Sequence, residues 1–418
     1  MASQEVDPPI RIAYVTAKLP FGSGEPFIVP EILALLERGC EVTVVPMRSG
    51  GEVADGDAEA LLPRTEAAPL LSPRVLIAAL RETLRSPRRV GGALLLLRGS
   101  SLRILVKNLA VLPKGLWLGR LLRETGAEHI HAHWAGTSAT LALIAGHVSD
   151  VPWSLTAHRW DIAENNLLRT KARRACFVRA ISAHGAGEMR GIVGDRDWAA
   201  WVLYMGVRLA SAPGARAAEG PFRVLTAARF VEKKGHVHLL EAARLLRDRG
   251  IELRVDLAGD GPLEASLRER VADLGLGGVV EFLGRLSHDN LLADLERCRW
   301  DAMALPSIVT PSGELEGIPV SLIEAMARGV PVVGTDTGGV PELLAEEAGL
   351  LVRAGDAVAL AEALELLARD PTTRAAFGER GRARVEEAFS VERIAAELEA
   401  RFRECVAGAR ARDSRRRV

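Results

Sequence analysis

LPSIVTPSGELEGIPVSLIEAMARGVPVVGTDTGGVPE, residues 305–342, predicts a strand end, a loop, a helix, a short strand and a glycine turn. Pro319 suits the first turn of a helix, where no intrahelical N–H bond is needed, so we expect the helix to start at about Ile318. Glu316 then precedes this helix and Glu324 lies in its second turn, roughly 12 Å away at ~1.5 Å per residue. An extended ligand such as a nucleotide-sugar has its hexose and ribose about that far apart.

A simpler interpretation of the two glutamates stays open. The helix dipole alone favours an acid at a helix start, and Glu324 could be one polar position on an amphipathic helix. The surrounding residues, among them Ile318, Leu322 and Met326, are mostly apolar. A carboxylate among them would lose water and require a partner.

The run EGIPVSLIEAMARGVPVVGTDTGGVPELL resembles the E-x7-E segment of family 4 glycosyltransferases, which are retaining enzymes of the GT-B fold. EGIPVSLIEAMA is similar to the bacterial exopolysaccharide and colanic-acid branch of that family. The resemblance implies an α/β chain with two Rossmann-like domains facing across a cleft, and a C-terminal helix crossing back to the N-terminal domain. It also implies sugar transfer from a nucleotide-sugar to a hydroxyl.

Composition is typical of a globular protein with two domains. The chain has 418 residues, of which 48% are hydrophobic and 26% charged. Its 54 basic residues balance 54 acidic ones, so overall charge indicates no nucleic-acid partner. Four scattered cysteines fit reduced thiols in a cytosol. The polar, acidic opening is unlike a signal peptide, and no apolar run approaches the ~20 residues of a spanning helix.

The N-terminal region predicts a parallel sheet. A strand over residues 11–16, a helix over 27–38 and a strand over 41–46 follow one another. The loop LPFGSGEPF contains Gly24 and Glu25, but it lacks the third glycine of a dinucleotide fingerprint, and the second strand ends without an acid for a ribose. An NAD site is therefore disfavoured. The loop is either a tight turn or a phosphate and sugar contact; the resemblance favours the contact, with Glu25 on the acceptor side.

Residues 70–125 are strongly basic. Eleven basic residues stand against two acidic ones, a net of +9, and apolar stretches alternate with the arginines. Basic amphipathic helices of this kind can lie on an anionic membrane. Ordinary surface helices, with arginine stems along apolar neighbours, are the alternative.

The segment HIHAHWAG predicts a strand with its three histidines on one face. We expect no metal there, since no cysteine is near and the adjacent glutamate would point to the other face. His133 stands last, at the end where open α/β sheets bind ligands. It resembles the family histidine beside the transferred sugar. His158, in SLTAHRWDI, resembles an acceptor-side histidine of the family, although a structural role is equally open.

The second half of the chain restarts the strand and helix alternation at residue 222. Arg229 and Lys234 follow the strand over 222–228, so two cations can converge on one phosphate site, unless they are ordinary surface cations. Their spacing is similar to the R-x4-KG motif that binds the donor diphosphate in the family, with Ala228 in place of the usual glycine before the arginine. The resemblance also places the base near residues 284–286.

These observations predict the following organisation and site. The domains are an N-terminal acceptor domain over 1–212, with its basic helical segment 70–125, a linker over 213–221, a nucleotide-sugar domain over 222–389, a crossing helix over 390–408 and a disordered basic tail over 409–418. The catalytic residues are His133, Arg229, Lys234 and Glu316; the donor contacts are Gly24, Arg229, Lys234, Glu316, Gly317, Ile318, Pro319, Val320 and Glu324; the acceptor-side residues are Glu25 and His158.

The predicted function is a retaining glycosyltransferase without metal or cofactor, acting on a glycan, a lipid-linked or a small-molecule acceptor in the cytoplasm, or peripherally at the inner face of the membrane. A UDP- or GDP-sugar is the expected donor, although side chains do not decide the base. Two alternatives are a sugar-nucleotide epimerase of the same fold, which needs no acceptor pocket, and a non-catalytic scaffold. The intact E-x7-E pair, Arg229 and Lys234 disfavour the scaffold.

Overall fold

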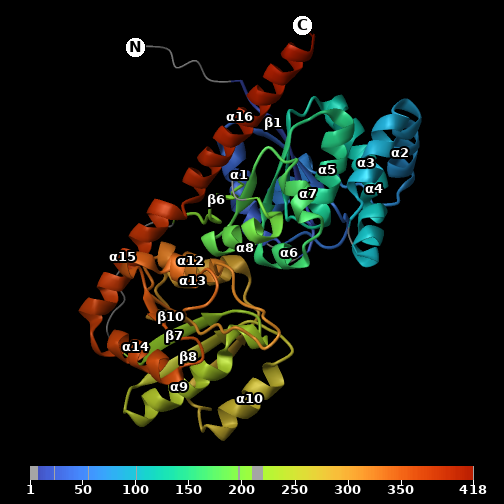
Figure 1. Cartoon of the computed structure of the whole chain (residues 1–418). Helices are drawn as coiled ribbons and strands as arrows, with labels where there is room; N and C mark the ends of the chain where they lie inside the picture. Colours follow the sequence, from blue (N-terminus) through green and yellow to red (C-terminus); the bar gives the residue numbers. More distant parts are fainter. Residues whose placement is uncertain are drawn as a thin grey trace, which may run out of the picture. The chain divides into compact units, whose positions relative to one another are not determined.

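The chain folds into two compact α/β units (Figure 1). The computed structural model describes residues 8–22, 24–54, 56–99, 101–195, 198–209 and 220–417. Unit 1 comprises Met1–Tyr204 and Glu392–Val418, and unit 2 comprises Met205–Val391. Most of the predicted linker, residues 213–219, lies outside the described residues.

Unit 1 contains a six-stranded parallel sheet in the order β2-β1-β3-β4-β5-β6. Its strands are β1 (Arg11–Thr16), β2 (Glu41–Pro46), β3 (His129–His133), β4 (Trp153–Ala157), β5 (Val178–Ala180) and β6 (Trp201–Val202). Its helices are η1 (Pro26–Ile28), α1 (Val29–Glu37), η2 (Gly56–Arg64), α2 (Pro73–Arg85), α3 (Pro87–Leu96), α4 (Leu102–Thr125), α5 (Thr137–Ser149), α6 (Arg159–Glu164), α7 (Leu168–Ala172), α8 (Ala183–Val193) and α16 (Val391–Arg417). The strand order reverses between β1 and β3, which defines the topological switch point of this sheet.

Unit 2 contains a second six-stranded parallel sheet, in the order β12-β11-β10-β7-β8-β9, with its switch point between β7 and β10. Its strands are β7 (Phe222–Ala227), β8 (Leu253–Ala258), β9 (Val280–Gly284), β10 (Ala302–Leu305), β11 (Val332–Thr335) and β12 (Leu350–Val352). Its helices are η3 (Glu232–Lys234), α9 (His236–Asp248), α10 (Glu264–Asp273), α11 (His288–Glu296), α12 (Val320–Ala327), α13 (Val340–Leu343), η4 (Ala345–Glu347), α14 (Ala357–Arg369) and α15 (Pro371–Ala388).

Three details of the sequence prediction concern element boundaries. The strands predicted over 11–16 and 41–46 are confirmed. The helix predicted to start at Ile318 starts at Val320, because Pro319 is extended, with ψ at 115°, and serves as the N-cap. The prediction of a disordered tail is wrong, since α16 continues to Arg417. Alanine and arginine dominate that stretch, and both have high helix propensity.

The basic segment forms α2, α3 and α4, which lie together in unit 1 (Figure 1). Not all of its charges reach the surface. Lys114 is fully buried and donates hydrogen bonds to the carbonyls of Pro46, Met47 and Ala68, and burial lowers its pKa to about 8. Within the described ranges, none of the helices has both the length and the apolar character needed to span a bilayer.

Candidate active site

The loops that follow β7 and β10 meet at the switch point of unit 2. Gly235, which ends η3, has a φ of 64°, and a Cβ there would lie 1.9 Å from the carbonyl oxygen of Pro306. Ile308 donates its N–H to the carbonyl of Lys233 at 2.8 Å. Because glycine has no Cβ, Gly235 allows the two loops to approach each other this closely. Ligands of open α/β sheets bind at such a place.

Lys234 and Glu316 come from these two loops and form an ion pair. The Lys234 Nζ donates to Glu316 Oε2 at 2.5 Å, and the Ser307 hydroxyl donates to the same oxygen at 3.4 Å. Burial, the largest single effect, raises the pKa of Glu316, but the positive charges of Lys234 and Lys233 and the hydrogen bonds to the carboxylate together outweigh it, so the net shift is downward. The carboxylate therefore stays ionised beside the cation.

The glycine turn after β11 holds Glu316 in place. Gly338 has a φ of 58°, and a Cβ there would lie 1.8 Å from the carbonyl oxygen of Glu316. Gly339 donates its N–H to the carbonyl of Gly317 at 3.2 Å. The GGVPE turn thus presses against the backbone at Glu316, which explains why two glycines stand there.

The second carboxylate of the stretch, Glu324, lies in the second turn of α12 and is buried. Its Oε1 is 2.6 Å from Nε2 of His288, the first residue of α11. The hydrogen bond and charge of Glu324 raise the pKa of His288. Glu316 therefore pairs with the ammonium group of Lys234, and Glu324 pairs with the imidazole of His288. Both carboxylates follow β10 in unit 2.

The other residues of unit 2 that are predicted to bind the nucleotide-sugar lie close in sequence to Lys234 or to Glu316. Arg229 follows the end of β7 and is exposed, with no side-chain hydrogen bond or ion pair to the described part of the chain. Its guanidinium is thus available for an anion. The stretch from Gly317 to Val320 links Glu316 to α12, with Ile318 and Pro319 buried.

The glycine loop after β1 in unit 1 is organised by Glu25. This buried carboxylate accepts hydrogen bonds from the N–H groups of Ala17, Lys18 and Leu19 at 2.6–3.0 Å, and from the indole of Trp134 at 2.5 Å. Both oxygens are engaged, so Glu25 shapes the loop. Gly24, by contrast, is exposed, and a Cβ there would meet no atom within 4 Å.

His133 and His158 lie side by side at the switch point of unit 1. Their Nε2 atoms are 2.7 Å apart, and Nδ1 of His133 lies 2.9 Å from the Tyr14 hydroxyl. Tyr14 also donates to Glu31 at 2.5 Å, and Glu31 pairs with the fully buried Arg179 at 2.6 Å. Burial lowers the pKa of both histidines, that of His158 to about 3.

These contacts determine which histidine nitrogen carries the proton. The one hydroxyl hydrogen of Tyr14 is donated in the hydrogen bond to Glu31, so a neutral His133 must donate from Nδ1 to the tyrosine oxygen. Its Nε2 is then an acceptor, and His158 donates from Nε2. Nδ1 of His158 is then the acceptor that faces the backbone N–H of Asp161 in the capping box of α6.

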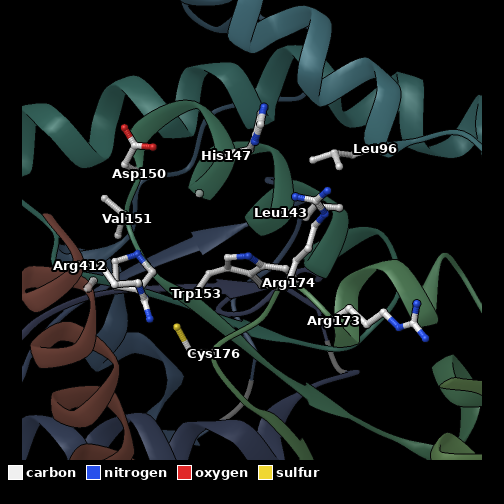
Figure 2. Close-up of a pocket in the computed structure, with 13 residues that line it drawn as sticks. Leu96, Leu143, His147, Asp150, Val151, Trp153, Arg173, Arg174, Cys176 and Arg412 are labelled. Carbon is white, nitrogen blue, oxygen red and sulfur yellow. The ribbon is translucent and has the colours of Figure 1, made fainter. Parts of the chain in front are cut away.

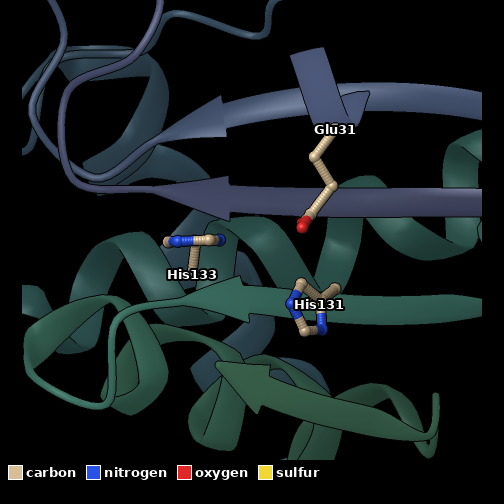
Figure 3. Close-up of side chains that lie close together, drawn as sticks. All are labelled: Glu31, His131 and His133. Atoms are coloured by element: carbon tan, nitrogen blue, oxygen red, sulfur yellow. The ribbon is translucent and has the colours of Figure 1, made fainter. Parts of the chain in front are cut away.

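Glu31, His131 and His133 also form a group whose ligand atoms lie within 4.8 Å of one another (Figure 3). Each is engaged by protein partners: Glu31 by Tyr14 and Arg179, as above, and both ring nitrogens of His131 by the hydroxyls of Ser154 and Thr156 at 2.8–2.9 Å. The group is a hydrogen-bonded network, and the expectation of no metal stays a prediction.

The sequence analysis did not identify several residues that lie at these two switch points. Tyr14, Glu31 and Arg179 come from β1, α1 and β5, and their contacts span more than a hundred positions. An arginine inside the short apolar strand Val178–Ala180 was a signal, because a buried cation requires a partner. Nothing in the sequence singled out His288.

Comparison with known proteins identifies the family. Residues 211–384 match the family described as Glycosyl transferases group 1. The putative colanic acid biosynthesis glycosyltransferase WcaL of Escherichia coli (strain K12) is 30% identical over 415 residues, which cover 93% of this chain and 98% of WcaL. The amylovoran biosynthesis glycosyltransferase AmsK of Erwinia amylovora is 37% identical over 171 residues, 41% of this chain and 42% of AmsK.

Solved structures agree on the fold. Anabaena HepE, crystallised with UDP, has a TM-score of 0.68 at 19% identity, covering 94% of this chain and all of HepE. Sucrose-phosphate synthase from Thermosynechococcus elongatus has a TM-score of 0.68 at 20% identity, covering 96% and 100%. The chain is thus a glycosyltransferase with the GT-B fold, and it belongs to glycosyltransferase family 4, in the bacterial exopolysaccharide branch.

Proposed function

We propose that this glycosyltransferase moves a hexose from a nucleotide-sugar to a hydroxyl of a glycan, lipid-linked or small-molecule acceptor, with retention of the anomeric configuration. The observation that carries the proposal is the Lys234–Glu316 ion pair across the switch point of unit 2. A cation and an anion held 2.5 Å apart match a ligand that has a diphosphate next to a polyhydroxylated ring. HepE, a protein of the same fold, binds UDP.

The chemistry requires stabilisation of the leaving diphosphate, which gains negative charge as the bond to the anomeric carbon breaks. Lys234 and the exposed Arg229 supply two cations at the end of β7. Groups fixed before the reaction stabilise that charge without reorganisation. We therefore assign transition-state stabilisation to these two residues.

Because cations can neutralise the phosphates, we propose that turnover needs no metal and no resident cofactor. Turnover unchanged by EDTA would support this, and restoration of EDTA-inactivated enzyme by Mg²⁺ or Mn²⁺ would contradict it.

The two carboxylates would recognise the sugar hydroxyls and the ribose. Glu316 lies next to Lys234 and would accept hydrogen bonds from the hexose. Glu324, which His288 now contacts, would accept from the ribose hydroxyls. We infer that UDP- or GDP-sugars are the donors.

The acceptor hydroxyl would be bound by unit 1. His158 would lie beside this hydroxyl, and His133 would fix its ring as a positioning residue. Two residues later Trp160 is 62% exposed, and its large flat face suits the apolar face of a sugar. Glu25 would act indirectly by holding the loop beside them.

We further propose a peripheral contact of unit 1 with the inner face of the cytoplasmic membrane, where lipid-linked acceptors reside. α2 and α4 expose apolar side chains at helical spacing: Leu76, Leu80 and Leu84, then Leu102, Val106 and Leu109, with exposures of 41–77%. Exposed arginines lie between them, such as Arg81, Arg85 and Arg103. The one carboxylate between residues 67 and 123 is Glu82, which is buried and paired with Arg123.

Liposome sedimentation tests this contact. The chain should bind vesicles with anionic lipid at low salt and release as salt rises. Leu80→Glu with Leu84→Glu should abolish binding, whereas Leu366→Glu, at an exposed leucine of α14 in unit 2, should not. Absence of binding at low salt, or equal loss in both variants, would remove the membrane proposal.

The glycosyl-transfer proposal is tested by nucleotide release. A thermal-shift panel of UDP-, GDP-, ADP- and dTDP-sugars first identifies the donor, since a bound ligand stabilises the fold. Release of the nucleoside diphosphate should then depend on added acceptor. Conversion of the nucleotide-sugar without acceptor would indicate the epimerase, and no stabilisation by any nucleotide would indicate the scaffold.

A further inference from the structure

Unit 1 has a pocket of about 690 Å³ at the start of β4 (Figure 2). Trp153, the first residue of β4, lines it, whereas His158 follows the last residue of that strand. Five strand residues, roughly 16 Å, separate the two ends. The pocket is therefore not part of the site proposed above.

The C-terminal helix α16 supplies part of the wall. Ala409 and Arg412 line the pocket together with Cys176, which lies in the turn before β5. Cys405 stands one turn before Ala409 on the same helix face, because positions i, i+4 and i+7 align. Its thiol is near enough to that of Cys176 to lower the pKa of Cys176 and to have its own pKa raised. Two cysteines that are 229 positions apart in the chain are thus neighbours at this pocket.

The surroundings favour the thiolate of Cys176. Its thiol is exposed, whereas Cys405 is half-buried. The hydrogen bond from Cys405 and the positive charge of Arg412 lower the pKa of Cys176, although partial burial opposes them. The exposed Arg173 and Arg174 add positive charge to the same pocket. A solvent-accessible thiolate with a second thiol at hand is the arrangement of a reversible redox site.

We propose that Cys176 and Cys405 form a reversible disulfide that fastens α16 to unit 1. With a peroxide as oxidant, the Cys176 thiolate attacks one peroxide oxygen, giving a sulfenic acid and releasing an alcohol or water. The Cys405 thiol then attacks the sulfenic sulfur, the S–S bond forms and water leaves. Two thiols are oxidised and one peroxide is reduced, and a dithiol reverses the reaction.

The disulfide would stabilise the C-terminal end of α16, which few other contacts attach to unit 1. Phe402 packs against the rings of His129 and His131 at 4.8 and 5.2 Å. Beyond Cys405, the helix makes an exposed ion pair between Arg410 and Glu128. A disulfide at Cys405 would extend the firm attachment toward the C-terminal end, so the oxidised helix should open less often.

The test uses the full chain, treated with hydrogen peroxide and then alkylated and digested. The expected product is a peptide pair joining Cys176 to Cys405 within one chain, lighter by two hydrogen atoms, while the buried Cys40 and the half-buried Cys298 are both recovered alkylated when alkylation is carried out in denaturant. Amide exchange of α16 should slow by about tenfold or more in the oxidised chain and recover with dithiothreitol. Cys405→Ser should abolish both effects, and Cys298→Ser should preserve both.

Two results would overturn the proposal. One is oxidation of Cys176 to a sulfinic or sulfonic acid while Cys405 stays free. The other is an oxidised chain whose α16 amides exchange as fast as those of the reduced chain. Because both cysteines reach solvent, the serine variants should fold, and the exchange pattern of the sheet provides the check.

Discussion

The two units share one architecture but differ in what they place at the switch point. In unit 1 this position holds a buried network in which His133 and His158 are kept neutral. In unit 2 it holds the ion pair of Lys234 and Glu316, with the exposed Arg229 nearby in sequence. Neutral groups suit a hydroxyl that must lose a proton, and charged groups suit a diphosphate. Under the function proposed above, the same sheet topology would serve the two substrates of one transfer reaction.

Among the substitutions that test this difference between the units, the one at Lys234 should have the largest effect on turnover. Lys234→Ala should reduce kcat by ~10² or more, because the cation stabilises charge that develops only in the transition state. Steady-state kinetics with saturating donor measure it. Arg244→Ala, on the exposed face of α9, is the matched control and should keep turnover within twofold. A Lys234 variant as active as the control would remove the assignment.

The contrast also predicts unequal responses to acid. Burial holds the pKa of His129 and of His158 at about 3, against an ordinary 6.5. The unfolded chain therefore binds protons that folded unit 1 does not, so its stability falls as pH drops below about 6.5. At pH 5 one such histidine lowers the free energy of unfolding by roughly 2 kcal/mol. Asp161, whose pKa burial raises to about 7, opposes this in part.

Unit 2 should respond differently over the same range. Burial lowers the pKa of His236 to about 4, so unit 2 also loses some stability as pH falls. The pKa of His288 is raised, so its contribution is fully present below 6.5 and offsets that loss, and the lowered pKa of Glu316 matters only below 4.5. Hydrogen exchange at pH 7.5 and 5, corrected for intrinsic rates, resolves the units. β3 and β4 should lose more protection than β7 and β10. Equal loss in both sheets would show that the buried histidines do not control stability.

A smaller effect is expected at the ribose end of unit 2. Glu324→Gln should raise the KM for the donor about tenfold with little change in kcat, because binding to the ribose is the same in ground and transition states. Glu362→Gln, on α14 of the same unit, is the control. A fall in kcat with unchanged KM would move Glu324 from donor binding to the chemical step.

The sequence predicted the regular elements of both sheets well, for a physical reason. Buried parallel strands read as short apolar runs, as in β1 and β2, and their limits were predicted to the residue. The end of α16 was not predicted, because a basic alanine-rich tail is compatible with helix and with disorder alike. Pro319 shows why the first residue of a helix is harder to predict. Proline can occupy either the N-cap or the first turn, and the sequence does not determine which of the two backbone conformations it adopts.

The charged half of the site was more predictable than the neutral half. Lys234 and Glu316 stand in loops beside glycines, and the sequence indicates both the loops and the charges. Tyr14, Glu31 and Arg179 sit inside regular elements and become partners only when β1, α1 and β5 assemble. Their pattern in sequence resembles that of ordinary core or helix residues.

The smallest expected effect separates the two nitrogens of His133. An asparagine amide reaches where Nδ1 lies and a glutamine amide where Nε2 lies. His133→Asn should keep the bond to Tyr14 and lose the one to His158, lowering kcat about fivefold, the size of one neutral hydrogen bond. His133→Gln should restore most of this loss, and donor affinity should stay constant in both. If the two variants lose turnover equally, His133 merely fills space; if donor affinity falls instead, it contacts the nucleotide-sugar rather than positioning His158.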